Sequence, residues 1–190
     1  MNPSMTTLNK RYVSLRVHGT SVHVQYAPPD LPTKVVKVTR LAEGTLIQSN
    51  YPSEIALHFS IPTPFMTEKR NTLAAIFDRF FKSDQIEKVF ESARLRVARV
   101  ELYLTHQGAN LGLLEVMDGE RRLASTQVSA LPTIDVNTDP YQEKSGGNII
   151  YEINHEVITS LGIKLTFGFS HWNLDENHIH IVAAKAIFVS

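Results

Sequence analysis

Apolar and polar residues alternate with a period of two over much of the chain, a pattern that predicts β-strands. The clearest alternation follows residue 161, where Ile163, Leu165 and Phe167 occupy every second position. The last apolar stretch, residues 179–189, is apolar on both sides, which is typical of a central strand. The same reasoning predicts strands at residues 13–17, 22–26, 36–38, 54–61, 95–104, 111–117, 123–128 and 149–153.

Short turns between these stretches predict hairpins. His18-Gly19-Thr20 separates the first two strands, so we expect residues 1–50 to form amino-terminal β-hairpins. Asp118-Gly119 separates a later pair, and glycine suits such a turn because it adopts positive φ readily. In residues 95–104 we expect Val97 on one side of the strand and Val100 on the other.

The hydrophobic period changes after Pro64. Thr67 is a plausible helix N-cap, and the apolar residues that follow recur at helical spacing: Leu73, Ile76, Phe77, Phe80 and Phe81. Asp84 with Glu87 indicates the start of a shorter helix that ends near Ser92. The sequence therefore predicts one or two amphipathic helices in the middle of the chain.

A long loop is predicted at residues 129–148, which have no hydrophobic period. Its residues Pro132, Pro140 and Tyr141 are candidates for contacting another subunit, since long loops in compact domains usually bind something or move. Together these elements predict an α+β fold in a single domain of residues 1–190, with antiparallel, sandwich-like sheets. The parts are 1–50 (hairpins), 54–128 (strand, helices and strands), 129–148 (loop) and 149–190 (carboxy-terminal strands).

Composition narrows the classes of protein. The chain has no cysteine, which excludes disulfide scaffolds, thiol catalysis and thiolate zinc sites. No apolar run approaches the roughly 20 residues that span a bilayer, and the polar start lacks the apolar centre of a signal peptide. We therefore expect a soluble, unprocessed protein.

Charge is balanced in total but not along the chain. Residues 1–100 carry 14 Lys+Arg and 8 Asp+Glu, a net charge of +6, and residues 101–190 carry 5 and 11, a net charge of −6. The two halves can attract each other within one molecule, drive subunits to stack, or present a basic face to a polyanion.

Basic residues concentrate around the predicted helices. These candidates for nucleoprotein or membrane binding are Lys69, Arg70, Arg79, Lys82, Lys88, Arg94, Arg96 and Arg99. Five carboxylates are interleaved with them, so an ordinary solvated helix face explains the cluster equally well.

Three histidines near the end of the chain form the best metal candidate. His178 and His180 are two apart on a predicted strand and therefore share a side, with His171 nearby. The signal is weak, because the glutamate that follows such a pair in cupins is replaced by the stretch Val182 to Lys185. No nucleophile elbow, phosphate loop or His-Glu-x-x-His motif occurs either, so we expect no enzyme, catalytic residue, cofactor or metal.

Two stretches of the chain carry a family resemblance. The first is the predicted strand Ile55 to Ile61 followed by Pro64-Phe65 and a predicted helix with Ala74-Ala75, and the second runs from Leu161 to Phe167 and ends in Asp175-Glu176. In this order and pattern they resemble rhabdovirus matrix proteins, in particular those of the plant-infecting branch. The resemblance implies a self-assembling viral structural protein that links ribonucleoprotein to the membrane. Its partners would be itself, the viral nucleoprotein or ribonucleoprotein, and an anionic membrane. Its location would be the virion, the host cytoplasm and the inner face of host membranes.

Two other functions fit the sequence. A jelly-roll coat or movement-type viral protein would bind RNA directly, and a metal-dependent β-sandwich or cupin-like enzyme would use His171, His178 and His180. Direct RNA binding is therefore left open.

Overall fold

The computed structural model describes residues 12–63, 95–131, 133–135 and 145–189. This part of the chain is built almost entirely from β-strands, and its helical segments are two single 3₁₀ turns, Gly19–Ser21 and Val128–Ala130. The expected α+β class is therefore wrong for the described residues, which form two antiparallel sheets. The predicted helices at 67–92, on which that class depended, lie outside the described residues.

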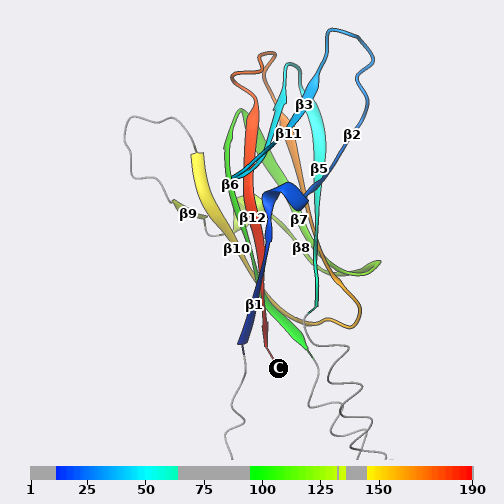
Figure 1. Cartoon of the computed structure of the whole chain (residues 1–190), viewed down its shortest axis with the longest axis vertical. Helices are drawn as coiled ribbons and strands as arrows, with labels where there is room; N and C mark the ends of the chain where they lie inside the picture. The colour runs from blue at the N-terminus through cyan, green and yellow to red at the C-terminus, as the bar shows by residue number, and fades with distance from the viewer. Residues whose placement is uncertain (1–11, 64–94, 132, 136–144, 190) are drawn as a thin grey trace, which may run out of the picture.

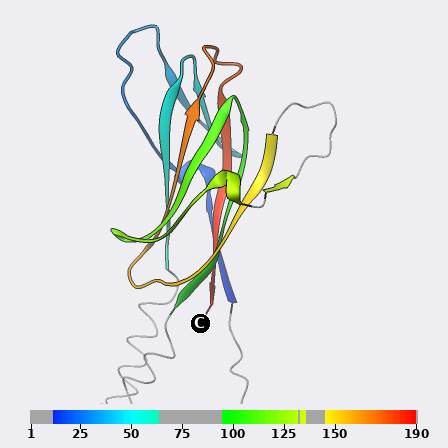
Figure 2. The same cartoon turned by 180° about the vertical axis from the view of Figure 1, so that it is seen from behind.

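The two sheets pack face to face (Figures 1 and 2). Sheet A contains, in spatial order, β3 (Val36–Leu41), β4 (Gly44–Ser49), β12 (His178–Val189), β6 (Arg96–Gln107), β10 (Ser145–Glu156) and β9 (Thr133–Asp135), with β1 (Tyr12–His18) also pairing with β12. Sheet B contains β2 (His23–Tyr26), β5 (Ser53–Ile61), β11 (Leu161–Phe169), β7 (Ala109–Asp118) and β8 (Arg121–Gln127).

The strand order is that of a jelly roll. Strands β4, β12, β6 and β10 form the centre of sheet A, and β5, β11, β7 and β8 face them in sheet B. Along the chain, every connection between these eight strands crosses from one sheet to the other except the β7–β8 hairpin. Two sheets linked in this way make the double Greek key of jelly-roll domains.

The predicted amino-terminal hairpin of residues 13–17 and 22–26 is wrong. β1 pairs with β12 in sheet A, whereas β2 pairs with β5 in sheet B. The turn between them carries the chain across the sandwich and packs tightly on β12, since a Cβ on Gly19 would lie 2.0 Å from the Ile181 carbonyl oxygen. Within residues 1–50, β3 and β4 do form a hairpin.

Alternate residues of the central strands fill one apolar core. Leu165, Phe167, Ile47 and Phe188 are among its fully buried side chains. The predicted central strand at 179–189 is confirmed, because β12 lies between β6 on one side and β1 and β4 on the other.

Strand β6 departs from the predicted alternation at Ala98. Its register shifts against β12 between Ile187 and Phe188, and against β10 between Glu152 and His155. As a result Val97 and Val100 are both buried, contrary to the expectation that they face opposite sides. Such bulges turn a side chain that strict alternation would place elsewhere, here Arg99, which lines a depression on the outer face.

The predicted loop 129–148 is too long, because it contains β9 and the first residues of β10. Pro132, Pro140 and Tyr141, the candidate self-association residues, lie outside the described residues. Each sheet contains strands from both of the oppositely charged halves, so the charge difference along the chain does not separate the two sheets.

Candidate functional site on the outer face of sheet A

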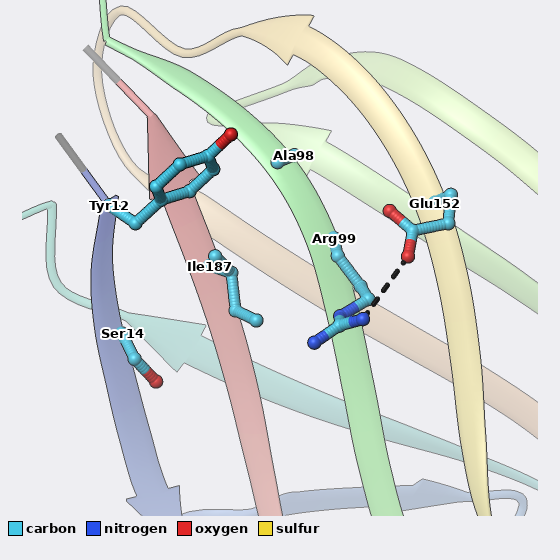
Figure 3. A pocket seen from close by; sticks show the side chains of 6 residues that line it. All are labelled: Tyr12, Ser14, Ala98, Arg99, Glu152 and Ile187. Carbon is cyan, nitrogen blue, oxygen red and sulfur yellow. Dashed lines mark hydrogen bonds and ion pairs between the residues drawn. The ribbon is translucent and has the colours of Figure 1, made fainter. Parts of the chain in front are cut away.

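The outer face of sheet A carries a depression of about 380 Å³ over strands β1, β12, β6 and β10 (Figure 3). It is lined by Tyr12, Ser14, Ala98, Arg99, Glu152 and Ile187. Ser14 pairs with Ile187, Ile187 with Arg99, and Arg99 with Glu152, so four strands contribute one row of side chains. We refer to these six residues as the sheet A depression.

Local backbone irregularity explains why the face is hollow here. The two register shifts of β6 beside Ala98 occur at this level, and the small side chain of Ala98 leaves the floor open. On β10 the irregularity includes Asn154, whose φ of 58° lies in the left-handed region. β-Bulges are frequent beside functional sites, where they redirect side chains.

Arg99 is the central charged group of the depression. Its Nε lies 2.9 Å from Glu101 Oε1, although the N–H is not aimed well enough for a hydrogen bond, and its Nη1 donates to Glu152 Oε1 at 3.3 Å. Figure 3 shows one terminal nitrogen turned toward Glu152 and the other toward Ile187. The side chain is 35% exposed, so the guanidinium is held in place and still accessible to a partner.

Glu101 anchors the surrounding polar network. Its carboxylate accepts hydrogen bonds from the Tyr103 hydroxyl and from Lys185 Nζ at 3.0 Å. Burial raises the pKa of Glu101, yet these two hydrogen bonds outweigh burial and bring the pKa below its usual value. The hydrogen bond between Tyr103 and Glu101 is also the main cause of a raised pKa for the Tyr103 hydroxyl. The network therefore keeps a carboxylate ionised beneath the arginines.

Strand β1 adds an aromatic and a basic residue to this face. The Tyr12 side chain is 66% exposed at the edge of the depression. The Arg16 guanidinium carbon lies 4.9 Å from the centre of the Tyr103 ring, a cation–π contact that fixes an exposed charge. Sequence reasoning missed both residues. The available signal was the polar side of β1, where Tyr12, Ser14 and Arg16 alternate with apolar residues.

The predicted basic region is only partly within the described residues. Arg96 and Arg99 lie on β6, Arg96 exposed and Arg99 in the depression. The remaining candidates fall outside the described residues: Lys69, Arg70, Arg79, Lys82, Lys88 and Arg94.

The predicted histidine cluster does not assemble into a metal site. His178 and His180 alternate on β12 with the buried Ile179 and Ile181, so both point away from the core, while His171 lies 3.6 Å from Glu176 in the loop before β12. Among the described residues, no three His, Asp or Glu side chains lie close enough together to hold a metal ion. A cupin-like site would need ligands directed between the sheets, where this protein has apolar side chains.

A second hollow, of about 440 Å³, lies on the outer face of sheet B. Gly112 and Gly168 form part of its floor, so the hollow results from missing side chains more than from converging polar groups.

The part of the chain that the structure describes contains no helix that could span a membrane.

Comparison with known proteins finds no matching protein family and no matching curated protein. A solved structure of the carbohydrate-binding module TmCBM61 in complex with β-1,4-galactotriose is similar, with a TM-score of 0.39 and 14% identity over 90% of this chain and 88% of that chain. The catalytic unit of a GH87 α-1,3-glucanase from Streptomyces thermodiastaticus gives a TM-score of 0.34 and 11% identity over 92% of this chain. The chain covers 25% of that enzyme's length. At these scores neither similarity indicates a function for this chain.

Proposed function

We propose that this chain is a non-enzymatic viral structural protein of matrix type, which self-associates and links a ribonucleoprotein to a membrane. The observation that best supports the proposal is the gathering of Arg96 and Arg99, two of the predicted nucleoprotein-binding residues, with Arg16 and Tyr12 on one face of sheet A. Its place of action would be the virion and, in the host, the cytoplasm and the inner face of membranes.

The chemistry of this face favours a protein partner. Exposed tyrosine and arginine are enriched in protein interfaces, where they supply much of the binding energy. Here the arginines alternate with Glu101 and Glu152, so the face presents charges of both signs. The phosphates of bare RNA would be repelled by these carboxylates, whereas a protein surface can carry charges that pair with both the arginines and the carboxylates. We therefore assign the face to the nucleoprotein component of the ribonucleoprotein.

Co-sedimentation with the nucleoprotein encoded by the same genome, purified with its RNA, tests this assignment. We expect the double variant Tyr12→Ala, Arg96→Ser to weaken binding at least tenfold, because both side chains are exposed and neither supports the core. Arg122→Ser is the matched control, an exposed arginine of sheet B that pairs with Glu115. Equal binding by both variants and the unaltered chain would refute a role for this face.

A second candidate function is supported by the jelly-roll strand order, which is common in viral coat proteins. A coat or movement-type protein would bind RNA without nucleoprotein. Its binding constant for single-stranded RNA would fall steeply with salt, because each neutralised phosphate releases counterions. Tight, salt-dependent RNA binding by the purified chain would favour this candidate over the matrix-type protein.

A further inference from the structure

The β2–β3 and β11–β12 loops lie at the end of the sandwich opposite the carboxy terminus (Figure 1). Together they expose three large apolar side chains. Trp172, in the β11–β12 loop, is 70% exposed, and Leu31 and Val35, in the β2–β3 loop, are 52% and 43% exposed. Lys34 joins the two loops, since its Nζ lies 5.9 Å from the centre of the Trp172 ring. We refer to Trp172, Leu31 and Val35 as the apolar tip.

Both loops are held in place by asparagine side chains. Asn177 is fully buried; its Oδ1 accepts a hydrogen bond from the His171 N–H, and its Nδ2 donates to the carbonyl oxygens of His171 and Ser49. Asn50 accepts from the Val35 N–H at 2.7 Å and donates to the Thr33 carbonyl at 2.7 Å. The exposed side chains are therefore presented by fixed backbone, which lowers the entropy that binding would cost.

The charged residues around the apolar tip do not make it positive, because the β2–β3 loop carries Asp30 with Lys34 and the β11–β12 loop carries Asp175 with Glu176. Lys34 Nζ lies 2.8 Å from Asp30 Oδ1, and His171 lies 3.6 Å from Glu176. This end therefore has no excess of positive charge that would attract anionic lipid headgroups. Exposed tryptophan beside aliphatic side chains is instead suited to the level of lipid headgroups, where the indole ring is partly in hydrocarbon and its N–H meets water.

We propose that the apolar tip contacts the interfacial region of a phospholipid bilayer, an inference that rests on the membrane link in the proposed function. Loop tips penetrate a fluid bilayer without needing a complementary pocket. Lys34 fits the same site, because its ammonium group lies 5.5 Å from the centre of the Tyr51 ring and 5.9 Å from that of the Trp172 ring and is paired with Asp30, so that it adds no unpaired charge to the tip.

Trp172 is the single tryptophan of the chain, so its fluorescence reports directly on the tip. We expect its emission to shift to shorter wavelength when the full chain meets vesicles of phosphatidylcholine, alone or with phosphatidylserine, and to be quenched by brominated lipid. Iodide should quench it in buffer and much less on vesicles. The double variant Leu31→Ser, Val35→Ser keeps the reporter and should bind vesicles at least tenfold more weakly, with an unchanged thermal unfolding midpoint.

Ile158→Ser is the matched control, since Ile158 is an exposed aliphatic residue, 46% exposed, in the β10–β11 loop away from both proposed surfaces. It should leave vesicle binding unchanged. Unaltered Trp172 emission with vesicles of both compositions would overturn the proposal. So would a shift that appears on raising protein concentration without lipid, because a second copy would then cover the tip.

Measuring nucleoprotein co-sedimentation on the same variants separates this inference from the proposed function. If the apolar tip fails to bind lipid while nucleoprotein binding persists, the lipid contact alone is wrong. If lipid binding persists while nucleoprotein binding is absent, the linking function is wrong and the lipid contact stands.

Discussion

At the scale of single residues, the Asp118 carboxylate joins the β7–β8 turn to the loop between β10 and β11. It accepts hydrogen bonds from the backbone N–H groups of Ile158 at 2.9 Å, Thr159 at 2.8 Å and Ser160 at 3.2 Å. Burial raises the pKa of Asp118, but the hydrogen bonds prevail and lower it from 3.8 to about 2. The ionised carboxylate is therefore part of the folded structure.

This lowered pKa predicts a pH-dependent contribution to stability. Because the folded-state pKa lies below the unfolded value, the stabilisation is complete above about pH 4 and is lost as the pH falls from 3.8 toward about 2. The shift corresponds to roughly 2 kcal/mol. In urea unfolding, Asp118→Asn should be less stable by about that amount at pH 7, and the difference should narrow at pH 3. Glu120→Gln, an exposed position in the same β7–β8 turn, should have the same free energy of unfolding as the unaltered chain at both pH values.

The sequence identified half of this arrangement. Asp118-Gly119 was predictable as a tight turn, and the prediction is confirmed by the Gly119 φ of 59° and the pairing of Asp118 with Arg121. The acceptor role of Asp118 was not predictable, because its donors lie 40 to 42 residues further along the chain. An even longer separation in sequence hid Tyr12 and Arg16, which reach the face of Arg99 only because β1 and β6 both pair with β12.

At the scale of elements, β12 is the strand on which other segments depend. Its backbone is irregular between Ile181 and Ala183, where β4 ends and β1 begins as its neighbour. Gly44 and Gly19 both pack against this point, since a Cβ on Gly44 would lie 2.1 Å, and one on Gly19 2.0 Å, from the Ile181 carbonyl oxygen. The joint between three strands therefore requires residues without a side chain.

Adding a methyl group at this joint should force the strands apart. We expect Gly44→Ala to lower the free energy of unfolding by on the order of 3 kcal/mol, as overpacking of a tight core does. Gly168→Ala on β11 is the control, because the nearest atom to its new Cβ would be the Ser53 carbonyl oxygen at an ordinary 3.8 Å. Urea midpoints that coincide for the two variants would show that β12 can move to accept the methyl group.

The positions of the strands were predicted correctly where hydrophobic periodicity alone determines them. Which strands pair with each other was not predicted. Alternation located the strands around Leu57, Leu114 and Leu165, all buried in the core. It could not show that β1 and β2 belong to different sheets, because the turn at Gly19 looks the same in either arrangement. The bulge at Ala98 also has no signature in the pattern, since it is defined by the register of β6 against β12 and β10.

At the scale of the whole molecule, the fold was predicted only as β-rich and sandwich-like. The jelly-roll order depends on pairs such as Arg16 with Lys185, which are far apart in the chain. No local pattern encodes such pairs. The expected α+β class gave too much weight to one stretch whose sequence has a helical pattern, although the described residues on both sides of it form sheets.

The fold also changes what the charge difference along the chain predicts for self-association. Both sheets contain strands of the +6 half and strands of the −6 half, and charges such as Arg99 and Glu152 pair inside one molecule. Neither sheet therefore presents the charge of one half alone to a neighbouring subunit. We expect self-association, measured by light scattering, to change less than about threefold between 0.1 and 0.5 M NaCl, a range over which exposed ion pairs are strongly screened. Complete dissociation in 0.5 M NaCl would show that unlike charges hold the subunits together. A monomer at every concentration and salt would remove self-association from the proposed function.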